Sequence, residues 1–146
     1  MRKKLWWCMV GLITYLPFAE ASTSPIGRWT TVDDKTGEKK ADIQLSLSDG
    51  KLYGTIVHRY IKPGDPERCV ACPGKFKDKP IQGLRFIWGL QEQSDGSWKG
   101  GKLIDPKTGK IYHLKMIVKN DQLHVRGYIG VPLLGRTQVW VHAKDG

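Results

Sequence analysis

Two polar side chains near the end of the chain have the types and the spacing to hold an anion. Arg126 and Tyr128 are two residues apart in the segment 122–129, which alternates in the manner of a strand. Residues at that spacing point to the same face of a strand. A planar guanidinium group and a phenol hydroxyl can together hold a carboxylate or a phosphate. The other face of this segment is apolar and is the better candidate for the core, which would place the pair in solvent; the alternative is that the pair faces the barrel interior.

The last segment of the chain, 136–143, extends this candidate site. Arg136 stands at its start and supplies a second cation, and Trp140 supplies an apolar wall. Valines lie on one face of the segment and Trp140 lies on the other, so both faces contain apolar side chains. Either face could therefore line a pocket. We therefore expect Arg126, Tyr128, Arg136 and Trp140 to contact a small apolar or amphipathic anion.

Cys69 and Cys72 form a Cys-x-x-Cys pair that allows three interpretations: a structural disulfide, a redox pair or half of a metal site. A redox pair lies at the start of a helix, whose dipole lowers the thiol pKa. Prolines flank this pair inside an irregular stretch, so no helix can begin there. A zinc site needs four ligands, and the four histidines are scattered singly. The pattern favours a disulfide and predicts no metal.

The sequence carries no recognisable catalytic constellation. Most aspartates occupy turn positions, where a short carboxylate bonds the local backbone. No Gly-x-Ser-x-Gly, no His-Glu-x-x-His and no phosphate-binding loop is present. We therefore expect a protein that is not an enzyme and that needs no cofactor.

The elements that must position these residues are short strands. Alternating segments separated by turn residues predict eight of them, at 26–32, 41–48, 51–61, 84–91, 98–104, 112–119, 122–129 and 136–143. Asp49-Gly50 is a strong signal for a tight hairpin. Seventeen glycines and eight prolines agree with an all-β fold. An eight-stranded antiparallel up-and-down barrel removes both sheet edges and leaves an interior that side chains or one small ligand can fill.

The first 21 residues have the three parts of a secretory signal peptide. A basic start is followed by the apolar stretch 5–16 and by Ala19-Glu20-Ala21, which has the form of a signal-peptidase site. The apolar stretch is too short to span a bilayer comfortably, which disfavours the alternative of an uncleaved anchor. We expect a signal peptide at 1–21 and one barrel domain at 22–146, in the periplasm or secreted, without a transmembrane segment.

Removal of this leader lowers the formal net charge from +10 to +8. A charge of that size favours anionic partners, such as components of the cell envelope. The lysines are scattered and form no run with interleaved aromatic residues, so the sequence argues against nucleic acid.

Gly27-Arg28-Trp29, at the start of the first predicted strand, resembles the Gly-x-Trp signature of lipocalins and other calycins. In those barrels the tryptophan closes one end beneath a basic residue near the end of the last strand. The resemblance implies that Trp29 and Lys144 close the barrel here. Arg136 departs from the lipocalin pattern because it lies at the opposite end of the last strand. Fatty-acid-binding barrels also carry an Arg-x-Tyr pair, on their last strand, whereas this pair lies on the penultimate one.

A longer ordered series of motifs resembles the DUF2147 family of exported bacterial proteins. It comprises Gly27-Arg28-Trp29, Asp49 to Gly54, Cys69 and Cys72, Gly100-Gly101, Ile104-Asp105-Pro106, Gly109 to Tyr112, Val125 to Gly130 and Gly135 to Trp140. The resemblance covers nearly all of residues 25–142. It implies a small calycin-like barrel and an envelope or secreted location, but no established activity.

The connection 129–135 is apolar, although loops that meet water are normally polar. It either folds over the barrel mouth or meets a membrane or a partner, and its short, glycine-bounded form favours the first alternative. Our overall expectation is an exported barrel that binds a lipid-like or fatty-acid-like anion. The alternative is a filled barrel that binds anionic envelope polymer or a protein.

Overall fold

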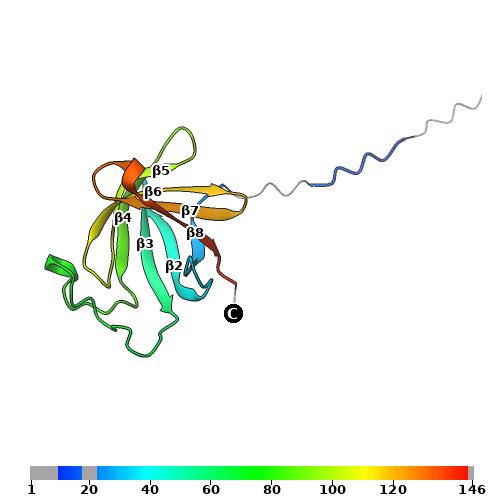
Figure 1. The fold of residues 1–146 in the computed structure, drawn as a ribbon. Coiled ribbons are helices and arrows are strands. Elements are labelled where there is room, and N and C mark those ends of the chain that lie inside the picture. The colour runs from blue at the N-terminus through cyan, green and yellow to red at the C-terminus, as the bar shows by residue number, and fades with distance from the viewer. Residues whose placement is uncertain (1–9, 18–22, 145–146) are drawn as a thin grey trace, which may run out of the picture.

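The computed structural model describes residues 10–17 and 23–144. Eight antiparallel strands form a closed barrel in chain order, as Figure 1 shows. They are β1 (Gly27–Val32), β2 (Lys39–Ser48), β3 (Lys51–Arg59), β4 (Arg85–Glu92), β5 (Trp98–Ile104), β6 (Ile111–Lys119), β7 (Gln122–Tyr128) and β8 (Arg136–His142). Pairing of β1 with β8 closes the ring. The predicted barrel is confirmed. Each strand begins and ends within two residues of the positions expected from the sequence.

The predicted leader lies mostly outside the described residues. Residues 10–17 belong to no helix or strand, and the expected cleavage site at Ala19-Glu20-Ala21 is not among the described residues. Within the described part of the chain, no helix has the length and the apolar character needed to cross a membrane. The signal peptide therefore stays a prediction.

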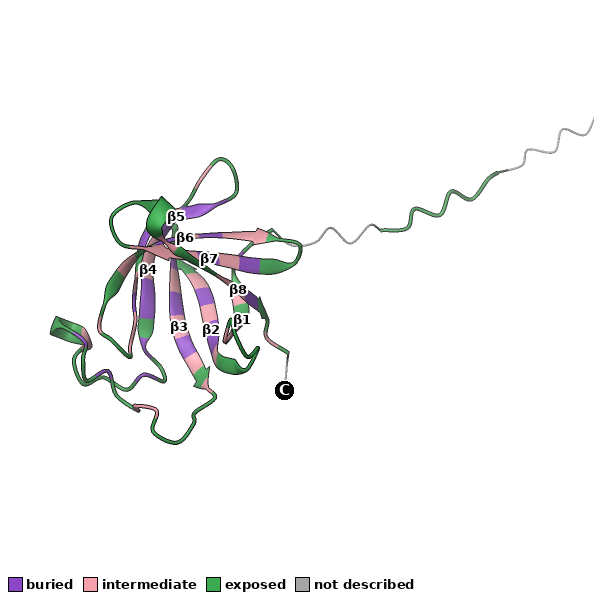
Figure 2. Cartoon of the chain, in the orientation of Figure 1, coloured by how far each residue is buried: buried purple, intermediate pink, exposed green. Residues whose placement is uncertain are grey.

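The core fills one end of the barrel. Alternate residues of each strand point inward, and Figure 2 shows the resulting bands of buried residues along the strands. The largest inward side chains gather near the tight hairpins, where Leu45, Leu52, Leu90, Met116 and Leu123 are fully buried. We call this the closed end.

Two of the connections at the closed end are two-residue turns. Asp49 and Gly50 link β2 to β3, and Asn120 and Asp121 link β6 to β7. All four have positive φ values, between 50° and 74°. That conformation matches the twist of a hairpin, and glycine, asparagine and aspartate adopt it at the lowest cost.

Trp29 plugs the closed end. Its side chain is fully buried, and its indole Nε1 donates a hydrogen bond to the carbonyl oxygen of Pro25 at 2.8 Å. His142 stacks on it with ring centroids 4.1 Å apart, and Asp121 lies 2.9 Å from the His142 imidazole. Lys144 is exposed beyond the end of β8. The expectation that Lys144 covers Trp29 is therefore corrected: His142 takes that place, because it is the ladder partner of Trp29.

Longer connections meet at the other end, which we call the mouth. Two of them repeat one turn, Asp33 to Glu38 and Asp105 to Lys110. In each, the aspartate N–H donates to the carbonyl of the last residue, at 2.8 Å in both turns. Gly37 and Gly109 complete the two turns with φ of 72° and 74°. The repeat places two similar rigid turns on the rim.

The loop between β3 and β4 carries the cysteine pair. Cys69 and Cys72 are buried, are joined by a disulfide and have Cα atoms 5.3 Å apart. The Cys69 N–H donates to the Lys79 carbonyl, and the Asp78 N–H donates to the Cys69 carbonyl. A Cβ atom added to Gly109 would lie 2.0 Å from the Ala71 carbonyl oxygen, so the rim turn 105–110 rests on the cysteine loop. The pair therefore stands where it can stiffen one side of the mouth.

Candidate functional site

The barrel encloses a cavity of about 610 Å³ that opens at the mouth. Its walls are the inward faces of the strands, and its rim is formed by the turns and loops at 33–40, 59–65 and 105–107. The apolar lining consists of Ile43, Ile56, Ile81, Phe86, Leu103, Leu114, Val125 and Trp140. A volume in this range suits a single small organic ligand.

The cavity exists because small residues stand on the inner face near the mouth. Thr31, Ala41 and Gly127 line it, whereas leucines and a methionine fill the closed end. A Cβ atom on Gly127 would meet Tyr112 at no less than 3.7 Å, so this glycine leaves usable space beside it. These three small residues therefore help to leave the mouth half of the interior open.

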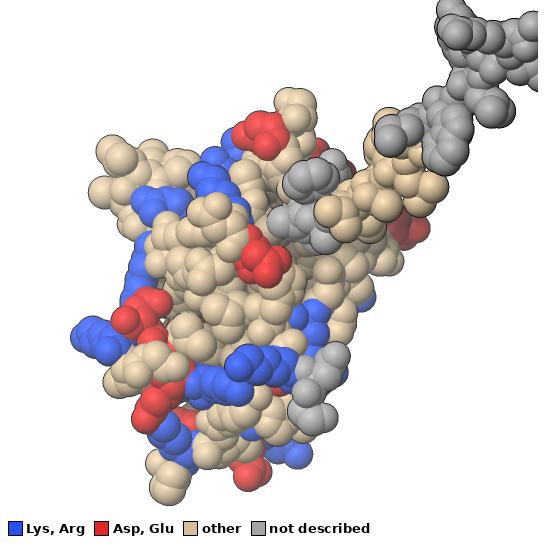
Figure 3. Space-filling view, turned by 90° about the vertical axis from the view of Figure 1, so that its right-hand side faces the viewer, with Lys and Arg blue, Asp and Glu red and all other residues tan. Residues whose placement is uncertain are grey.

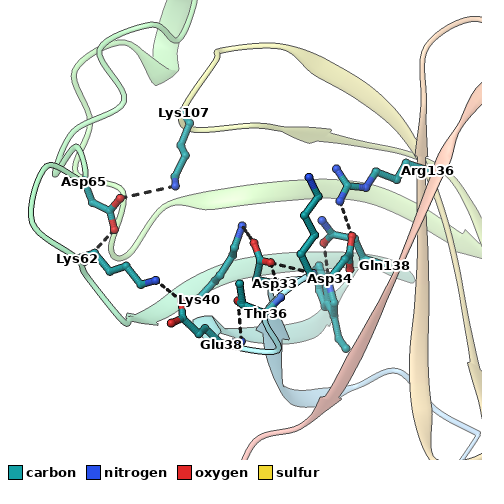
Figure 4. Close-up of polar contacts among 12 residues, drawn as sticks. Asp33, Asp34, Thr36, Glu38, Lys40, Lys62, Asp65, Lys107, Arg136 and Gln138 are labelled. Carbon is teal, nitrogen blue, oxygen red and sulfur yellow. Dashed lines mark hydrogen bonds and ion pairs between the residues drawn. The ribbon is translucent and has the colours of Figure 1, made fainter.

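Charged side chains surround the mouth in four ion pairs, most of which Figure 4 shows. Lys40 lies 3.2 Å from Asp33, Lys107 lies 3.7 Å from Asp65, and Arg136 lies 2.5 Å from Asp34. Lys62 pairs with Glu38. Exposed pairs of this kind contribute only about 0–1 kcal/mol each. Three of the pairs join different segments, 38 to 62, 65 to 107 and 34 to 136, so together they help to set how the rim segments sit relative to one another.

Two rim carboxylates are held in the ionised form by backbone donors. Asp33 accepts the N–H groups of Thr36 and Lys35 at 3.0 and 2.9 Å, and these bonds, together with Lys40, hold its pKa far below the ordinary 3.8. The N–H of Lys62 likewise lowers the pKa of Asp65, with a smaller contribution from Lys107. The negative charges of Asp33 and Asp65 therefore persist to lower pH than those of ordinary aspartates.

Arg59 brings a positive charge to the inner face. The register of the β2–β3 ladder shifts beside Asp42, so that Ile56 lies opposite Ile43 but Arg59 lies opposite Ala41. A bulge of this kind re-aims the side chains that follow it. Arg59 consequently joins Ala41 and Ile43 in the lining of the cavity. Strict alternation from Ile56 would have placed His58 there instead, which is why the sequence did not predict Arg59.

A buried carboxylate holds the strands together at this shift. Asp42 is 8% exposed; it accepts the hydroxyl of Thr30 at 2.6 Å and that of Tyr60 at 3.2 Å. Burial and the Asp42 carboxylate raise the pKa of Tyr60 above its ordinary value. The phenol therefore remains a donor at neutral pH, and the bond keeps Tyr60 and the adjoining Arg59 in place.

Six cationic residues line the cavity or its rim: Lys39, Lys40, Arg59, Lys62, Lys107 and Arg136. Four of them belong to the ion pairs above. Lys39 and Arg59 take part in none of the ion pairs found among the described residues. Lys39 lies over the Tyr60 ring, 5.7 Å from its centroid, and Arg59 helps to lower the pKa of Asp65. Of the two, Arg59 follows the apolar lining on the inner face.

Two of the four residues predicted to bind a ligand line this cavity. Arg136 stands at the rim, and Trp140 forms part of the wall. The indole Nε1 of Trp140 donates to Gln138 Oε1 at 3.2 Å, which leaves the ring faces as apolar surface. The β8 face that carries Gln138 and Trp140 is therefore the inner one, a choice that the sequence left open.

Arg126 and Tyr128 do not line the cavity, and their expected role inside the barrel is corrected here. Val125 and Gly127 occupy the inner face of β7, so the alternating residues face outward. Tyr128 stacks on His113 of β6, with ring centroids 5.4 Å apart. Arg126 donates to the carbonyls of Pro132 and Leu133 and to the hydroxyl of Thr137. The pair supports the outer wall and the following loop.

The apolar connection between β7 and β8 is exposed instead of folded over the mouth. Leu133 and Leu134 lie in the short 3₁₀ helix η2 (Pro132–Leu134) and are 86% and 79% exposed. The expectation that this segment covers the barrel is wrong, because Arg126 fixes its backbone on the outside.

The cysteine pair lies away from the cavity lining, with both side chains buried. The adjoining element η1 (Gly74–Phe76) is a single 3₁₀ turn, too short to act on a thiol through a helix dipole. Within the described residues, no three His, Cys, Asp or Glu side chains are grouped in the way a metal ion needs.

Comparison with known proteins agrees with the barrel. One family, described as an uncharacterized protein conserved in bacteria (DUF2147), matches residues 27–142. No curated protein sequence matches the chain. A similar solved structure is HP1028 from the human pathogen Helicobacter pylori, which is described as belonging to the lipocalin family. The match has a TM-score of 0.72 and 20% sequence identity and covers 85% of this chain and 86% of that one. The likeness shows a lipocalin-like fold.

Proposed function

The chain belongs to the DUF2147 family of bacterial proteins, and from its open barrel we propose that it binds a small amphipathic anion, lipid-like or fatty-acid-like, without catalysis. The observation that carries the proposal is one cavity with an apolar wall and a rim that bears six basic and four acidic residues, with Arg59 outside the ion pairs found among the described residues. Lipocalin-like barrels of eight strands have an interior suited to one small ligand.

The apolar wall is the site for a hydrocarbon chain. Its deep part combines aliphatic side chains with the rings of Phe86 and Trp140. Each methylene group removed from water there contributes about 0.8 kcal/mol to binding. Affinity should therefore increase with chain length until the cavity of about 610 Å³ is filled.

The rim is the site for the anionic head group. Arg59 offers a planar fork of donors that matches a carboxylate or a phosphate, and no ion pair among the described residues occupies it. Lys39 and Arg136 add positive charge on the same rim. A bound head group would thus lie near the bulge in β3, with its chain toward Trp140.

We place this binding outside the cytoplasm. The leader at 1–21 has the parts of a signal peptide, and the Cys69–Cys72 disulfide is compatible with an oxidising compartment. In that location the protein would carry or sequester its ligand between the membrane and the exterior.

The alternative of a filled barrel that binds anionic envelope polymer has less support. Its premise was an interior packed with side chains, whereas the mouth half of this barrel is open. On the face seen in Figure 3, basic side chains lie interspersed with acidic ones instead of forming one continuous patch. A polymer of negative charge would meet repulsion as well as attraction on that face.

Displacement of a fluorescent fatty acid tests the proposal. The competitors are used in matched pairs, a carboxylate and the primary alcohol of the same chain length. The difference in affinity within a pair measures the contribution of the rim, and the affinity of the alcohol measures that of the apolar wall. We expect both to compete and the carboxylate to bind at least about 10-fold more tightly, the value of one charge-assisted hydrogen bond. Absence of competition by every member of the series would overturn the proposal.

A further inference from the structure

The apolar loop that the ligand site does not use has the properties of a membrane contact. We propose that the connection between β7 and β8, residues 129–135, docks the barrel on an anionic lipid surface. This docking is independent of ligand binding, because the loop and its supporting arginine lie outside the cavity lining.

The loop presents several large apolar side chains to water. Leu133 and Leu134 are 86% and 79% exposed, and Ile129 and Val131 are 59% and 53% exposed. Figure 2 shows the short helix η2 coloured as exposed. A convex group of leucines suits insertion between lipid head groups better than a flat protein contact.

This exposure is built into the fold. The Arg126 side chain donates from Nε to the Pro132 carbonyl at 2.8 Å and from Nη2 to the Leu133 carbonyl at 3.4 Å. A Cβ atom on Gly135 would lie 2.7 Å from the Gly127 carbonyl oxygen, so the end of the loop is packed against β7. The leucines are therefore held outward and do not turn inward over the mouth.

The strands behind the loop are rich in basic residues. The strands β5, β6, β7 and β8 contain no aspartate or glutamate. Lys102, Lys115 and Arg126 lie along these strands, Lys99 and Lys119 lie beside the turns of the closed end, and Arg136 is paired with Asp34 on the rim. Lys115 lies directly across the ladder from Arg126. An anionic bilayer surface attracts basic groups of this kind within a Debye length.

The loop therefore adjoins strands that carry Lys102, Lys115 and Arg126, so apolar insertion and charge attraction can act together. The loop adjoins the mouth, since Arg136 directly follows it and stands on the rim. Docking through the loop would bring the mouth close to the lipid. The charge of these strands favours a lipid surface that is anionic over one that is zwitterionic.

Flotation with lipid vesicles tests the proposal. The chain from Ser22 onward contains all eight strands and lacks the apolar leader, which would bind lipid by itself. We expect it to float with phosphatidylglycerol vesicles, to float much less with phosphatidylcholine vesicles and to be released by high salt. The double variant Leu133→Asp and Leu134→Asp should lower vesicle affinity at least about 10-fold, through lost insertion and added charge repulsion.

Two controls make the result specific. Val70→Asp changes another exposed apolar side chain, 63% exposed on the cysteine loop, and should leave flotation unchanged. The double variant should retain its circular dichroism spectrum and its binding of a fluorescent fatty acid, so a defect in docking is distinguishable from a defect in the cavity. Failure of the wild-type chain to float with phosphatidylglycerol would overturn the proposal, as would equal flotation of the double variant. If the chain self-associates through the leucines and does not bind vesicles, the proposal is wrong and the loop is instead a contact between two copies of the chain.

Discussion

Arg59 lies directly opposite Ala41 in the β2–β3 ladder, so a guanidinium group shares the inner face of the barrel with apolar side chains. One register shift beside Asp42 produces this arrangement. It gives the cavity a cation next to its apolar wall, the combination that an amphipathic anion needs.

Replacing Arg59 should weaken the binding of anions specifically. Arg59→Met keeps a long side chain but removes the charged donors, and we expect affinity for a fatty acid to decrease about 10- to 100-fold. Affinity for the matching alcohol should change little. Arg85→Met is the matched control, since Arg85 lies over the Tyr53 ring, 4.2 Å from its centroid, and does not line the cavity. Fluorescence displacement measures both; an equal loss in the two variants would contradict the assignment.

Filling the cavity should block binding without unfolding the barrel. Gly127 faces the cavity with room for a side chain, and its backbone has no positive φ. We expect Gly127→Leu to lower ligand affinity at least about 10-fold, while the free energy of unfolding stays equal or increases because a strand glycine is replaced. Gly127→Ala should retain most of the affinity. Normal binding by a folded Gly127→Leu variant would show that the ligand lies elsewhere.

His142 and Lys144 should differ in their effect on stability. Loss of the ring that stacks on Trp29 makes His142→Ala less stable by about 1 kcal/mol, the value of an aromatic stacking contact. Lys144→Ala should change the free energy of unfolding by less than about 0.5 kcal/mol, as for an ordinary surface substitution. Urea denaturation at neutral pH provides the comparison. A larger loss of unfolding free energy in Lys144→Ala than in His142→Ala would indicate that Lys144 closes the barrel.

These residues show what the sequence could and could not predict. The eight strands and their order follow from period-2 alternation and turn residues, both of which are local. Trp29 and Cys69 were also recognisable, one from its motif and the other from its Cys-x-x-Cys spacing. The partner of Trp29 depends on the register between the first and the last strand, which only barrel closure sets.

The sequence also could not show which side chains line the cavity, because that too depends on how the strands pair. Arg59 reaches the cavity because of a bulge in the β2–β3 ladder. A bulge breaks the period-2 alternation without any marker in the sequence, so its position could not be predicted. Segment 136–143 carries apolar residues on both faces, so alternation alone could not choose the inner one; in 122–129 the apolar face that includes Val125 is the inner one, as alternation favours. Arg126 was expected to hold a ligand anion because the fork of an arginine matches one; in the structure that fork holds backbone carbonyls of the neighbouring loop.

Gly109 and Gly37 form a matched pair for testing the contact between the rim and the cysteine loop. They have nearly equal φ values of 74° and 72°, but only Gly109 has a neighbour, the Ala71 carbonyl, where a Cβ would stand. Gly37→Ala should cost about 1–2 kcal/mol from backbone conformation alone. Gly109→Ala should cost about 1–3 kcal/mol more because of overpacking. Equal losses in thermal or urea unfolding would mean that the two segments do not touch.

Asp33 should make stability depend on pH in the acid range. Its folded pKa is well below the ordinary 3.8 because backbone N–H groups and Lys40 favour the carboxylate. Below about pH 4 the unfolded chain therefore binds a proton that the folded chain does not. The stabilisation is complete above that pH and is lost as pH decreases toward the folded pKa.

Asp33→Asn should remove this part of the pH dependence. We expect the variant to be less stable than the wild type at pH 7 and the difference to shrink steadily as pH decreases below 4. Urea unfolding at a series of pH values measures it. A difference that is the same at pH 7 and at the acid end of the series would show that the Asp33 charge does not stabilise the turn.

Native mass spectrometry of the protein purified from the cells that produce it tests the central claim most directly. We expect a discrete added mass that is released as an amphipathic anion on denaturation and that is absent from Gly127→Leu protein purified in the same way. A bare mass for the wild-type protein, together with no thermal shift in the presence of fatty acids or lipids, would contradict the claim that the cavity binds such a ligand.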